Sequence, residues 1–225
     1  MRKLVHDLIR ALPFTGGALA QTGYLLRCTA SGRVALVDPG ATASIMIRTI
    51  QEAGEEVEAV YLTHAHVDHV EGVEVVRAFT DAPIYLHPEA RLFYDHAPEI
   101  ADRVGLGPLA PLPPPDRDLV PGEAVRVGEG VLEVRFTPGH APGHVIFYSA
   151  HDGFALVGDV IFAGTVGRTD LPGGDFLRLM RSIREEVLTL PDETRLLPGH
   201  GPETTVARER MGNPFLISQA PGSFA

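Results

Sequence analysis

The 225-residue sequence has one cysteine, few basic side chains and no long apolar run. The single cysteine, Cys28, cannot form a disulfide within the chain, which excludes a disulfide-stabilised scaffold. Nineteen basic against twenty-nine acidic residues give a formal net charge of −10, so a nucleic-acid backbone would on average be repelled. No apolar stretch approaches the roughly 20 residues that a membrane-spanning helix needs. We therefore expect neither a nucleic-acid partner nor a membrane partner.

The N-terminal segment is only loosely similar to an export signal. Arg2 and Lys3 precede apolar residues, but His6, Asp7 and Arg10 interrupt the apolar segment that such a signal requires. We therefore expect a cytoplasmic protein.

Hydrophobic residues make up 44% of the chain and charged residues 21%, which is typical of a folded globular protein. Short apolar segments predict strands over residues 24–28, 34–37, 57–62, 84–86, 124–127, 132–136, 145–148, 154–157 and 195–197. Patterning and end signals predict helices over residues 42–54, 70–79, 88–104 and 175–190. Thr42 or Ser44 is expected to cap the first helix and Gly54 to close it. Strands and helices mixed in this way favour sheets covered by helices.

Residues 105–121 are rich in proline and separate the two halves of the chain. A segment of this kind is either a stiff surface connection or a lid over a functional site. The sequence leaves both interpretations open.

A histidine-rich motif, Thr-His-Ala-His-Val-Asp-His, occupies residues 63–69 directly after a predicted strand. Its ligand pattern arises by chance about 0.001 times in a chain of this composition. Alternate residues of an extended loop point the same way, so His64 and His66 can converge on one metal ion. Asp68 and His69 lie one short turn later and can face a neighbouring position. Because the chain has no cysteine cluster, the motif favours an open site that holds a reactive water over a closed structural zinc site.

Three later segments each place one polar residue just beyond a predicted strand, namely His140, Asp159 and His200. Taken singly, each is typical of an ordinary turn. Together with residues 63–69 they follow four strand ends, where one edge of a sheet framework can gather them. The sequence therefore predicts a single metal site built from both halves of the chain.

The order of these residues resembles the metallo-β-lactamase-fold hydrolases over nearly the whole chain. The resemblance implies an α+β (α/β) fold, a four-layer αββα sandwich of two mixed sheets with helices on the outside. It implies that the first metal ion is held by His64, His66 and His140. It implies that the second is held by Asp68, His69 and His200. Asp159 would then bridge the two ions, and Asp38 would steady the histidine loop.

Two divalent ions held in this way supply a mechanism for hydrolysis. They share a water, lower its pKa toward neutrality, and let the resulting hydroxide attack a carbonyl that one ion polarises. Asp68 is expected to orient this nucleophile or to carry its proton. Zinc is the expected metal, and iron or manganese also fits the ligand set.

Residues 137–144, 158–170 and 213–215 resemble the short bacterial glyoxalase II-like, or hydroxyacylglutathione hydrolase-like, group. The resemblance implies one domain over residues 1–225, without the C-terminal helical substrate domain of the longer enzymes. It also implies a thioesterase that acts on S-2-hydroxyacylglutathione or a related small thioester. The lysine and tyrosine residues that contact the substrate in those enzymes are missing after Gly167. The sequence therefore supports thioester hydrolysis better than it supports glutathione as the thiol carrier.

Other branches of the superfamily fit less well. Asp159 stands where many true β-lactamases have a thiolate ligand, and His66 stands where diiron flavoproteins carry glutamate. Arg168 either binds a substrate carboxylate or forms a salt bridge with Asp170. His144 is either a residue that supports the metal site or a satisfied core histidine.

Two other activities stay open on the same fold. Persulfide dioxygenases share the Gly-Arg-Thr-Asp stretch of residues 167–170 and use one iron, at positions matching His64 or His66, His140 and Asp159. Those enzymes commonly have cysteine where this chain has His144. A lactonase is the other alternative. The sequence leaves the acyl group, the thiol carrier and the oligomeric state undetermined.

Overall fold

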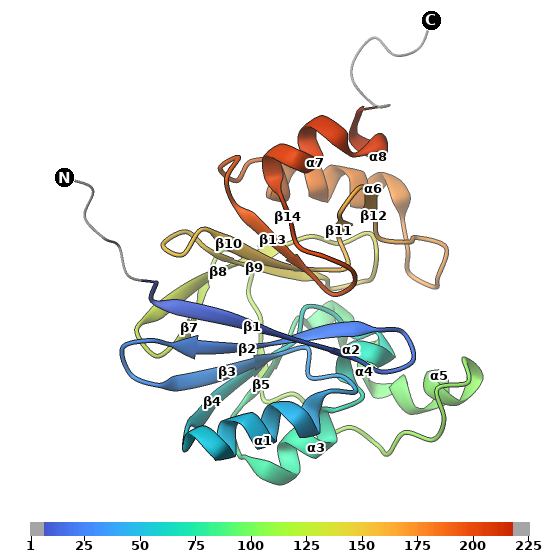
Figure 1. Ribbon diagram of the computed structural model, residues 1–225. Helices are drawn as coiled ribbons and strands as arrows, with labels where there is room; N and C mark the ends of the chain where they lie inside the picture. The colour runs from blue at the N-terminus through green and yellow to red at the C-terminus, as the bar shows by residue number, and fades with distance from the viewer. Residues whose placement is uncertain (1–6, 218–225) are drawn as a thin grey trace, which may run out of the picture.

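A computed structural model describes residues 7–217 and contains two six-stranded sheets that face each other, with helices on the outer side of each (Figure 1). This four-layer αββα arrangement confirms the predicted sandwich. The strands of the first sheet, in spatial order, are β1 (Ile9–Gly16), β2 (Gln21–Cys28), β3 (Arg33–Val37), β4 (Glu56–Tyr61), β5 (Ile84–Leu86) and β6 (Arg117–Asp118). Those of the second are β14 (Thr204–Thr205), β13 (Arg195–Pro198), β10 (Phe154–Gly158), β9 (Val145–Ser149), β8 (Gly130–Phe136) and β7 (Ala124–Val127).

Helices cover the two outer faces and the ends of the sandwich. On the first half they are α1 (Ala43–Ala53), α2 (Val67–Val70), α3 (Val73–Phe79), a 3₁₀ turn (Pro88–Ala90), α4 (Arg91–Asp95) and α5 (Ala97–Arg103). On the second half they are α6 (Phe176–Ser182), a π turn (Ile183–Val187), α7 (Val206–Gly212) and α8 (Pro214–Ile217). A short hairpin, β11 (Ile161–Phe162) and β12 (Thr165–Val166), stands apart from both sheets. Within residues 7–217, no helix is long and apolar enough to cross a membrane.

Both sheets are mixed, as the prediction requires. Strands β1, β2 and β3 pair antiparallel, whereas β3 to β6 pair parallel. In the second sheet β7 to β10 pair antiparallel, and β13 runs parallel to β10. Parallel neighbours end at the same edge, so the segments that follow them meet there.

Three apolar layers fill the spaces between the four structural layers, and the period-2 alternation of the strands distributes side chains among them. In β2, Leu25 packs toward α1 and α3, whereas Leu26 and Cys28 pack between the sheets. In β9, Ile146 faces the outer helices and Phe147 faces the other sheet. The thiol of Cys28 is thus fully buried in the central layer, as its apolar strand predicts.

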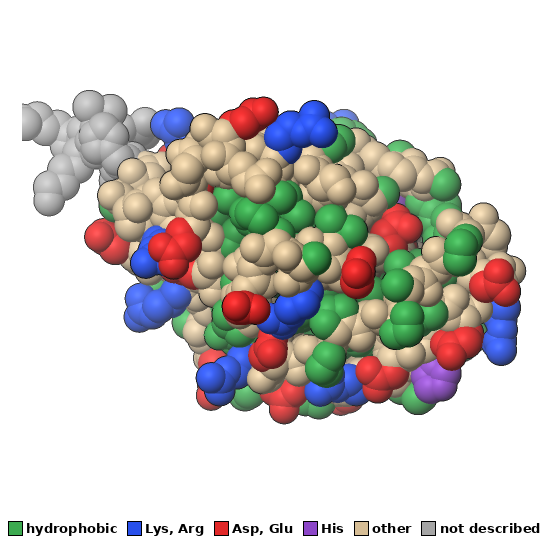
Figure 2. Space-filling model, turned by 90° about the horizontal axis from the view of Figure 1, so that it is seen from below, with side chains coloured by type: hydrophobic (Ala, Val, Ile, Leu, Met, Phe, Trp, Pro, Cys, Tyr) green, Lys and Arg blue, Asp and Glu red, His purple; other side chains and the backbone are tan. Residues whose placement is uncertain are grey.

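Charge is interspersed on the face that carries α1 and α3. Figure 2 views the molecule from below the orientation of Figure 1 and shows acidic, basic and apolar side chains alternating over this face. One sign of charge does not dominate there.

Several segments depart from the sequence prediction. The helix expected over residues 70–79 is divided at Gly72 between α2 and α3, and the apolar pattern does not indicate the short elements β6, β11, β12, β14, α7 and α8. Residues 9–16 form the edge strand β1, which apolar patterning did not indicate because Pro13 and alternating exposure hide it. Proline is tolerated there because an edge strand has backbone groups without a ladder partner. The single helix expected over residues 88–104 is broken into three pieces, since Pro98 fits only the first turn of α5. The helix expected over 175–190 changes to a π turn after Ser182.

The first helix begins and ends where the sequence predicts, but not with the expected cap. Gly54 closes α1 in the left-handed conformation, with φ of 65°. Thr42 occupies the N-cap position, yet its hydroxyl donates to the carbonyl oxygen of Phe14 at 3.3 Å and makes no cap hydrogen bond. That hydroxyl therefore ties α1 to β1.

The proline-rich segment is fastened to the first half of the molecule. Leu106, Leu109 and Leu112 pack against the apolar layer beneath the first sheet. The hydroxyl of Tyr94 donates to the carbonyl oxygen of Pro113 at 2.7 Å, and β6 then joins the sheet edge. These contacts favour the connecting role for the part that follows Leu106.

Two glycines let neighbouring backbone segments approach closely, and this contact positions the segment after β4. A Cβ at Gly40 would collide with the carbonyl oxygen of Asp68, and one at Gly72 would collide with that of Pro39. The turn after β3 can therefore lie directly against α2 only because both positions lack a side chain.

We predict that Gly40→Ala lowers the free energy of unfolding by about 3 kcal/mol or more, because backbone atoms must move to admit the methyl group. Gly54→Ala is the matched control, since Gly54 has a positive φ but open space around its Cβ position. Its cost is the left-handed conformation alone, about 1 kcal/mol. Urea denaturation of both variants measures the difference, and equal losses would contradict the close-approach argument.

Candidate metal centre

Three histidines from two distant segments converge at the end of the sandwich where α2 and the β11–β12 hairpin lie (Figure 1). His64 and His66 follow β4, and His140 follows β8. His66 Nδ1 lies 3.1 Å from His64 Nε2 and 2.8 Å from His140 Nε2. The three nitrogen atoms therefore face one another, as the motif and the resemblance predict.

A second cluster lies beside the first and is made of Asp68, His69 and His200. Asp68 Oδ2 is 3.1 Å from His200 Nε2 and 3.8 Å from His69 Nε2. His69 is fully buried, whereas the side chain of His200 keeps 27% of its exposure. The His200 side of this cluster therefore faces the solvent.

Asp159 lies between the two clusters. Its Oδ2 is 3.6 Å from His140 Nε2 of the first cluster and 3.5 Å from His200 Nε2 of the second. Its Oδ1 is 3.4 Å from His69 Nε2. Strand register explains this position, because Gly158 of β10 pairs with Pro198 of β13 and places the residues after them side by side.

Hydrogen bonds on the outer side of the clusters fix which imidazole nitrogen carries hydrogen. His140 Nδ1 donates to the carbonyl oxygen of Arg168 at 2.8 Å, and His200 Nδ1 donates to that of Leu19 at 3.1 Å. His69 Nδ1 donates to Asp38 Oδ2 at 2.9 Å. In each ring the Nε2 atom is left facing inward.

The same holds for His64, through a threonine hydroxyl. Thr63 Oγ1 donates its hydrogen to Asp38 Oδ2 at 2.6 Å, so it accepts from His64 Nδ1 at 3.0 Å. His64 Nε2 is then an unprotonated atom directed at His66. Asp38 also accepts from the backbone N–H of Thr63 at 2.8 Å, because Val37 and Tyr61 pair in register and bring the two strand ends together.

Burial keeps the imidazoles of the first cluster neutral. It lowers the pKa of His64 well below the ordinary value and that of His66 to about 3, with neighbouring histidines adding to the shift. Burial also lowers the pKa of His140, although Asp159 opposes it. Neutral imidazole is the form that binds a metal ion.

Carboxylates dominate the second cluster. Burial lowers the pKa of His69, but Asp159 and Asp38 outweigh it and raise that pKa well above the ordinary value. Burial would raise the pKa of Asp159, yet His69 and His140 hold it well below its usual range. The ionised Asp159 carboxylate thus attracts positive charge to this point of the fold.

The residues present fit divalent metal ions. Among residues 7–217, His69 Nε2 and Asp159 Oδ1 are buried and have no hydrogen-bond partner. Nitrogen atoms bound to a tetrahedral zinc ion at 2.0–2.1 Å are about 3.3 Å apart, close to the spacing in the histidine cluster. A Cβ at Gly199 would clash with both Asp159 and His69, so glycine there leaves room for the donor atoms. Imidazole and carboxylate donors suit zinc, iron and manganese alike.

Two other residues from the sequence analysis have partners in the structure. Arg168 makes a bidentate pair with Asp170, with both N–O distances 2.8 Å, and both side chains are exposed. His144 is fully buried: its Nδ1 faces Thr137 Oγ1 at 3.1 Å, and its Nε2 accepts from the backbone N–H of Asp159 at 3.1 Å. His144 is thus a satisfied core residue that also holds the start of the Asp159 loop.

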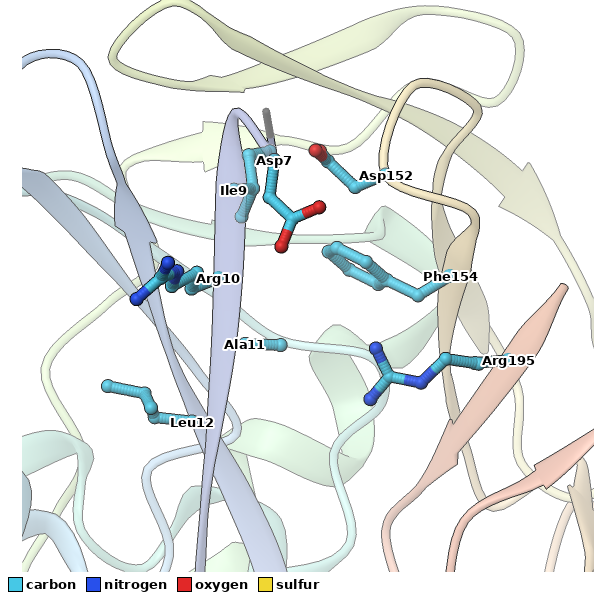
Figure 3. Close-up of a pocket in the computed structure, with 8 residues that line it drawn as sticks. All are labelled: Asp7, Ile9, Arg10, Ala11, Leu12, Asp152, Phe154 and Arg195. Atoms are coloured by element: carbon cyan, nitrogen blue, oxygen red, sulfur yellow. The ribbon is translucent and has the colours of Figure 1, made fainter. Parts of the chain in front are cut away.

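A cavity of about 590 Å³ opens over the clusters. Its floor is formed by five of the predicted ligands: His66, Asp68, His140, Asp159 and His200. A second hollow, of about 250 Å³, lies between β1 and strands β10 and β13 (Figure 3). Its Arg195 is paired with Glu203 at 2.8 Å, and its Asp152 accepts from the backbone N–H of Leu8 at 2.7 Å. None of the predicted site residues lines that second hollow.

The sequence did not indicate a buried hydrogen-bonded pair, Glu209 and Asn213, that supports the cavity wall and is called the latch. Glu209 Oε2 accepts from the backbone N–H of Gly164 at 2.9 Å, and Asn213 Nδ2 donates to the carbonyl oxygen of Thr165 at 3.0 Å. Asn213 also donates to Glu209 at 2.8 Å. The Asn-Pro-Phe stretch at residues 213–215 was the available signal, but its role depends on packing between α7 and the β11–β12 hairpin.

We predict that Asp38→Ala weakens metal binding by about 10- to 100-fold, because three hydrogen bonds that orient the histidine loop are lost. Competition with a chromophoric chelator measures the affinity. Asp152→Ala is the matched control, since Asp152 also accepts a backbone and a hydroxyl hydrogen bond but lies at the second hollow. An equal loss of affinity in both variants would show that the effect is general destabilisation.

Several known proteins are similar to this chain in sequence. The family description "Metallo-beta-lactamase superfamily" matches residues 16–200. The chain is 40% identical to the probable metallo-hydrolase YqgX of Bacillus subtilis, over 80% of this chain and 86% of that protein. It is 35% identical to the hydroxyacylglutathione hydrolase GloC of Haemophilus influenzae, over 83% and 88%.

Solved structures agree with these relatives. The BLEG-1 B3 metallo-beta-lactamase has a TM-score of 0.86 and 34% identity, covering 92% of this chain and 99% of that one. TTHA1623 in a di-iron-bound form has a TM-score of 0.83 and 40% identity, covering 91% and 100%. With the paired His and Asp clusters, these similarities show a metal-dependent hydrolase fold, and the chain belongs to the metallo-beta-lactamase superfamily.

Proposed function

We propose that the protein is a dinuclear metal-dependent thioesterase of the glyoxalase II type, which hydrolyses S-2-hydroxyacylglutathione or a related thioester. The observation that carries the proposal is the position of Asp159, whose two carboxylate oxygens lie within 3.6 Å of donor atoms in both clusters. A carboxylate placed in this way suits a bridge between two ions. The relative GloC, named as a hydroxyacylglutathione hydrolase, supports the substrate class.

The ligand assignment follows the two clusters. His64, His66 and His140 would hold one ion, Asp68, His69 and His200 would hold the other, and Asp159 would contact both. Zinc is the expected metal, with iron and manganese compatible with the same donors. A bound pair of divalent ions lowers the pKa of a water and polarises the substrate carbonyl.

Asp68 is the residue placed to handle the proton. Burial would raise its pKa, but the hydrogen bond from His200 and the nearby His69 lower it, so the carboxylate is ionised at neutral pH. Its position on the cavity floor lets Oδ2 orient an attacking water and accept a proton from it. A thiolate leaves readily, so the thioester needs little further acid catalysis from the chain.

The cavity itself suits a small organic substrate. Its volume of about 590 Å³ lies within the usual range for small-molecule sites. Asp68 and Asp159 line this cavity, so a thioester carbonyl bound in it would lie next to both clusters.

We predict that Asp159→Ala reduces bound metal to one ion or fewer per chain and lowers kcat for S-lactoylglutathione by about 1,000-fold or more, because the shared carboxylate is lost. Metal analysis and an anaerobic thioester assay on metal-loaded protein measure both quantities. The exposed Asp192, which pairs with Arg210 on the surface, supplies the control variant Asp192→Ala. Full activity in Asp159→Ala would contradict the bridging role.

The same assay separates the remaining activities. Rapid, chelator-sensitive hydrolysis without oxygen supports the thioesterase. Oxygen consumption with glutathione persulfide, together with a single bound iron and no thioester turnover, would instead support the persulfide dioxygenase. Turnover of a lactone alone would support a lactonase.

A further inference from the structure

The wall of the cavity above the clusters is mostly apolar. Apart from the five predicted ligands, ten residues line it, and eight of these are apolar: Leu19, Val67, Ile100, Val104, Leu106, Phe162, Val166 and Leu171. They come from the β1–β2 turn, α2, α5 with the segment just after it, the β11–β12 hairpin and the loop before α6. Five separate parts of the chain therefore present the same chemistry to one space.

Large apolar side chains lie at the rim of the cavity, where it meets solvent. Leu19 is 53% exposed, Val104 is 61% exposed and Leu171 is 36% exposed. Large apolar side chains left open to water around one hollow are typical of a surface that an apolar ligand covers. The three residues lie on three different segments, so the packing of any one loop does not explain why all three are exposed.

The charge of the wall does not suit an anionic carrier. Among the described residues that line the cavity, Arg168 is the only lysine or arginine, and its Nε and one terminal nitrogen are both paired with Asp170. Glutathione carries two carboxylates and one ammonium group. Burying a carboxylate against the apolar wall, away from the proposed metal ions of the floor, would cost free energy because the residues described there offer no unpaired lysine or arginine to replace its hydration.

The hairpin part of the apolar wall is held by hydrogen bonds. The latch from Glu209 and Asn213 binds the backbone of Gly164 and Thr165, between Phe162 and Val166 of the hairpin. Glu209 is itself buried, and it accepts a further hydrogen bond from Thr204 Oγ1 at 2.5 Å. A wall segment held in this way loses less conformational entropy when a ligand binds against it.

From these observations we propose that the site selects thioesters that carry an uncharged apolar chain or ring, and that it does not bind the carboxylates of glutathione. This inference rests on the proposed thioesterase function and narrows its substrate class. The apolar group lies against Val104, Phe162 and Leu171 while the thioester carbonyl faces the clusters.

A chain-length series tests the proposal on the metal-loaded full-length protein. The substrates are acetyl, butyryl, hexanoyl and octanoyl thioesters of N-acetylcysteamine, a small neutral thiol, and lactoyl thioesters of N-acetylcysteamine and glutathione. We expect kcat/KM to rise about three- to four-fold for each added methylene until the cavity is filled. We expect the lactoyl thioester of glutathione to be no better a substrate than its neutral counterpart.

A charge-introducing variant gives a readout that damage to the fold cannot imitate. Val104→Arg places an unpaired cation at the rim, so kcat/KM for the glutathione thioester should rise about ten-fold while that for the octanoyl thioester falls about ten-fold. Leu177→Ala is the matched control, because Leu177 is 73% exposed on α6 and does not line the cavity. It should leave both substrates unchanged.

The outcomes distinguish this inference from the function on which it rests. If no thioester is hydrolysed by the metal-loaded protein, the proposed function itself fails. If thioesters are hydrolysed but the rate is flat with chain length and at least ten-fold higher with glutathione, the apolar selectivity is overturned and the thioesterase stands. A rising series with the opposed response of Val104→Arg supports both.

Discussion

The constraint on which the rest of the structure depends is a buried group of imidazole nitrogens and carboxylate oxygens that face one another. Hydrogen bonds to Asp38, Thr63 and backbone carbonyl oxygens use the outer nitrogen of four imidazoles, so their inner nitrogens face one another and the carboxylates of Asp68 and Asp159. His69 Nε2 and Asp159 Oδ1 are left without partners. Burying such atoms is costly unless a cation satisfies them, which is why the clusters are best understood as a metal centre.

The αββα sandwich makes this arrangement possible because it ends several strands at one edge. The pairing of Val37 with Tyr61 brings Asp38 to Thr63, and the pairing of Gly158 with Pro198 brings the Asp159 loop beside Gly199. Close approaches at glycine then let these loops lie against one another with little space between them. The three apolar layers hold the strands, and through them the ligands, in fixed relative positions.

Two parts of the site contribute different properties. The floor of the cavity carries the histidines and aspartates that place the chain among the metal-dependent hydrolases. The wall is built from segments with no motif of their own, and it is apolar and held by the Glu209–Asn213 latch. The floor therefore carries the residues of the metal-dependent hydrolase superfamily, and we propose that the wall selects the substrate.

The sequence by itself predicted the donor residues, because His-x-His-x-Asp-His together with three strand-following residues is a pattern that rarely arises by chance. Its short, β-rich apolar runs predicted most of the strands, and its resemblance to the metallo-β-lactamase-fold hydrolases implied the sandwich architecture. It did not reveal β1, where Pro13 interrupts the pattern, or the break at Pro98.

Only the tertiary structure decided which nitrogen of each imidazole faces inward, that Arg168 is paired with Asp170, and that the cavity wall is apolar. These features depend on contacts between residues far apart in the chain. Leu19, Val104 and Phe162 share no sequence pattern, and the packing of the β1–β2 turn, α5 and the β11–β12 hairpin around one opening is what makes them neighbours.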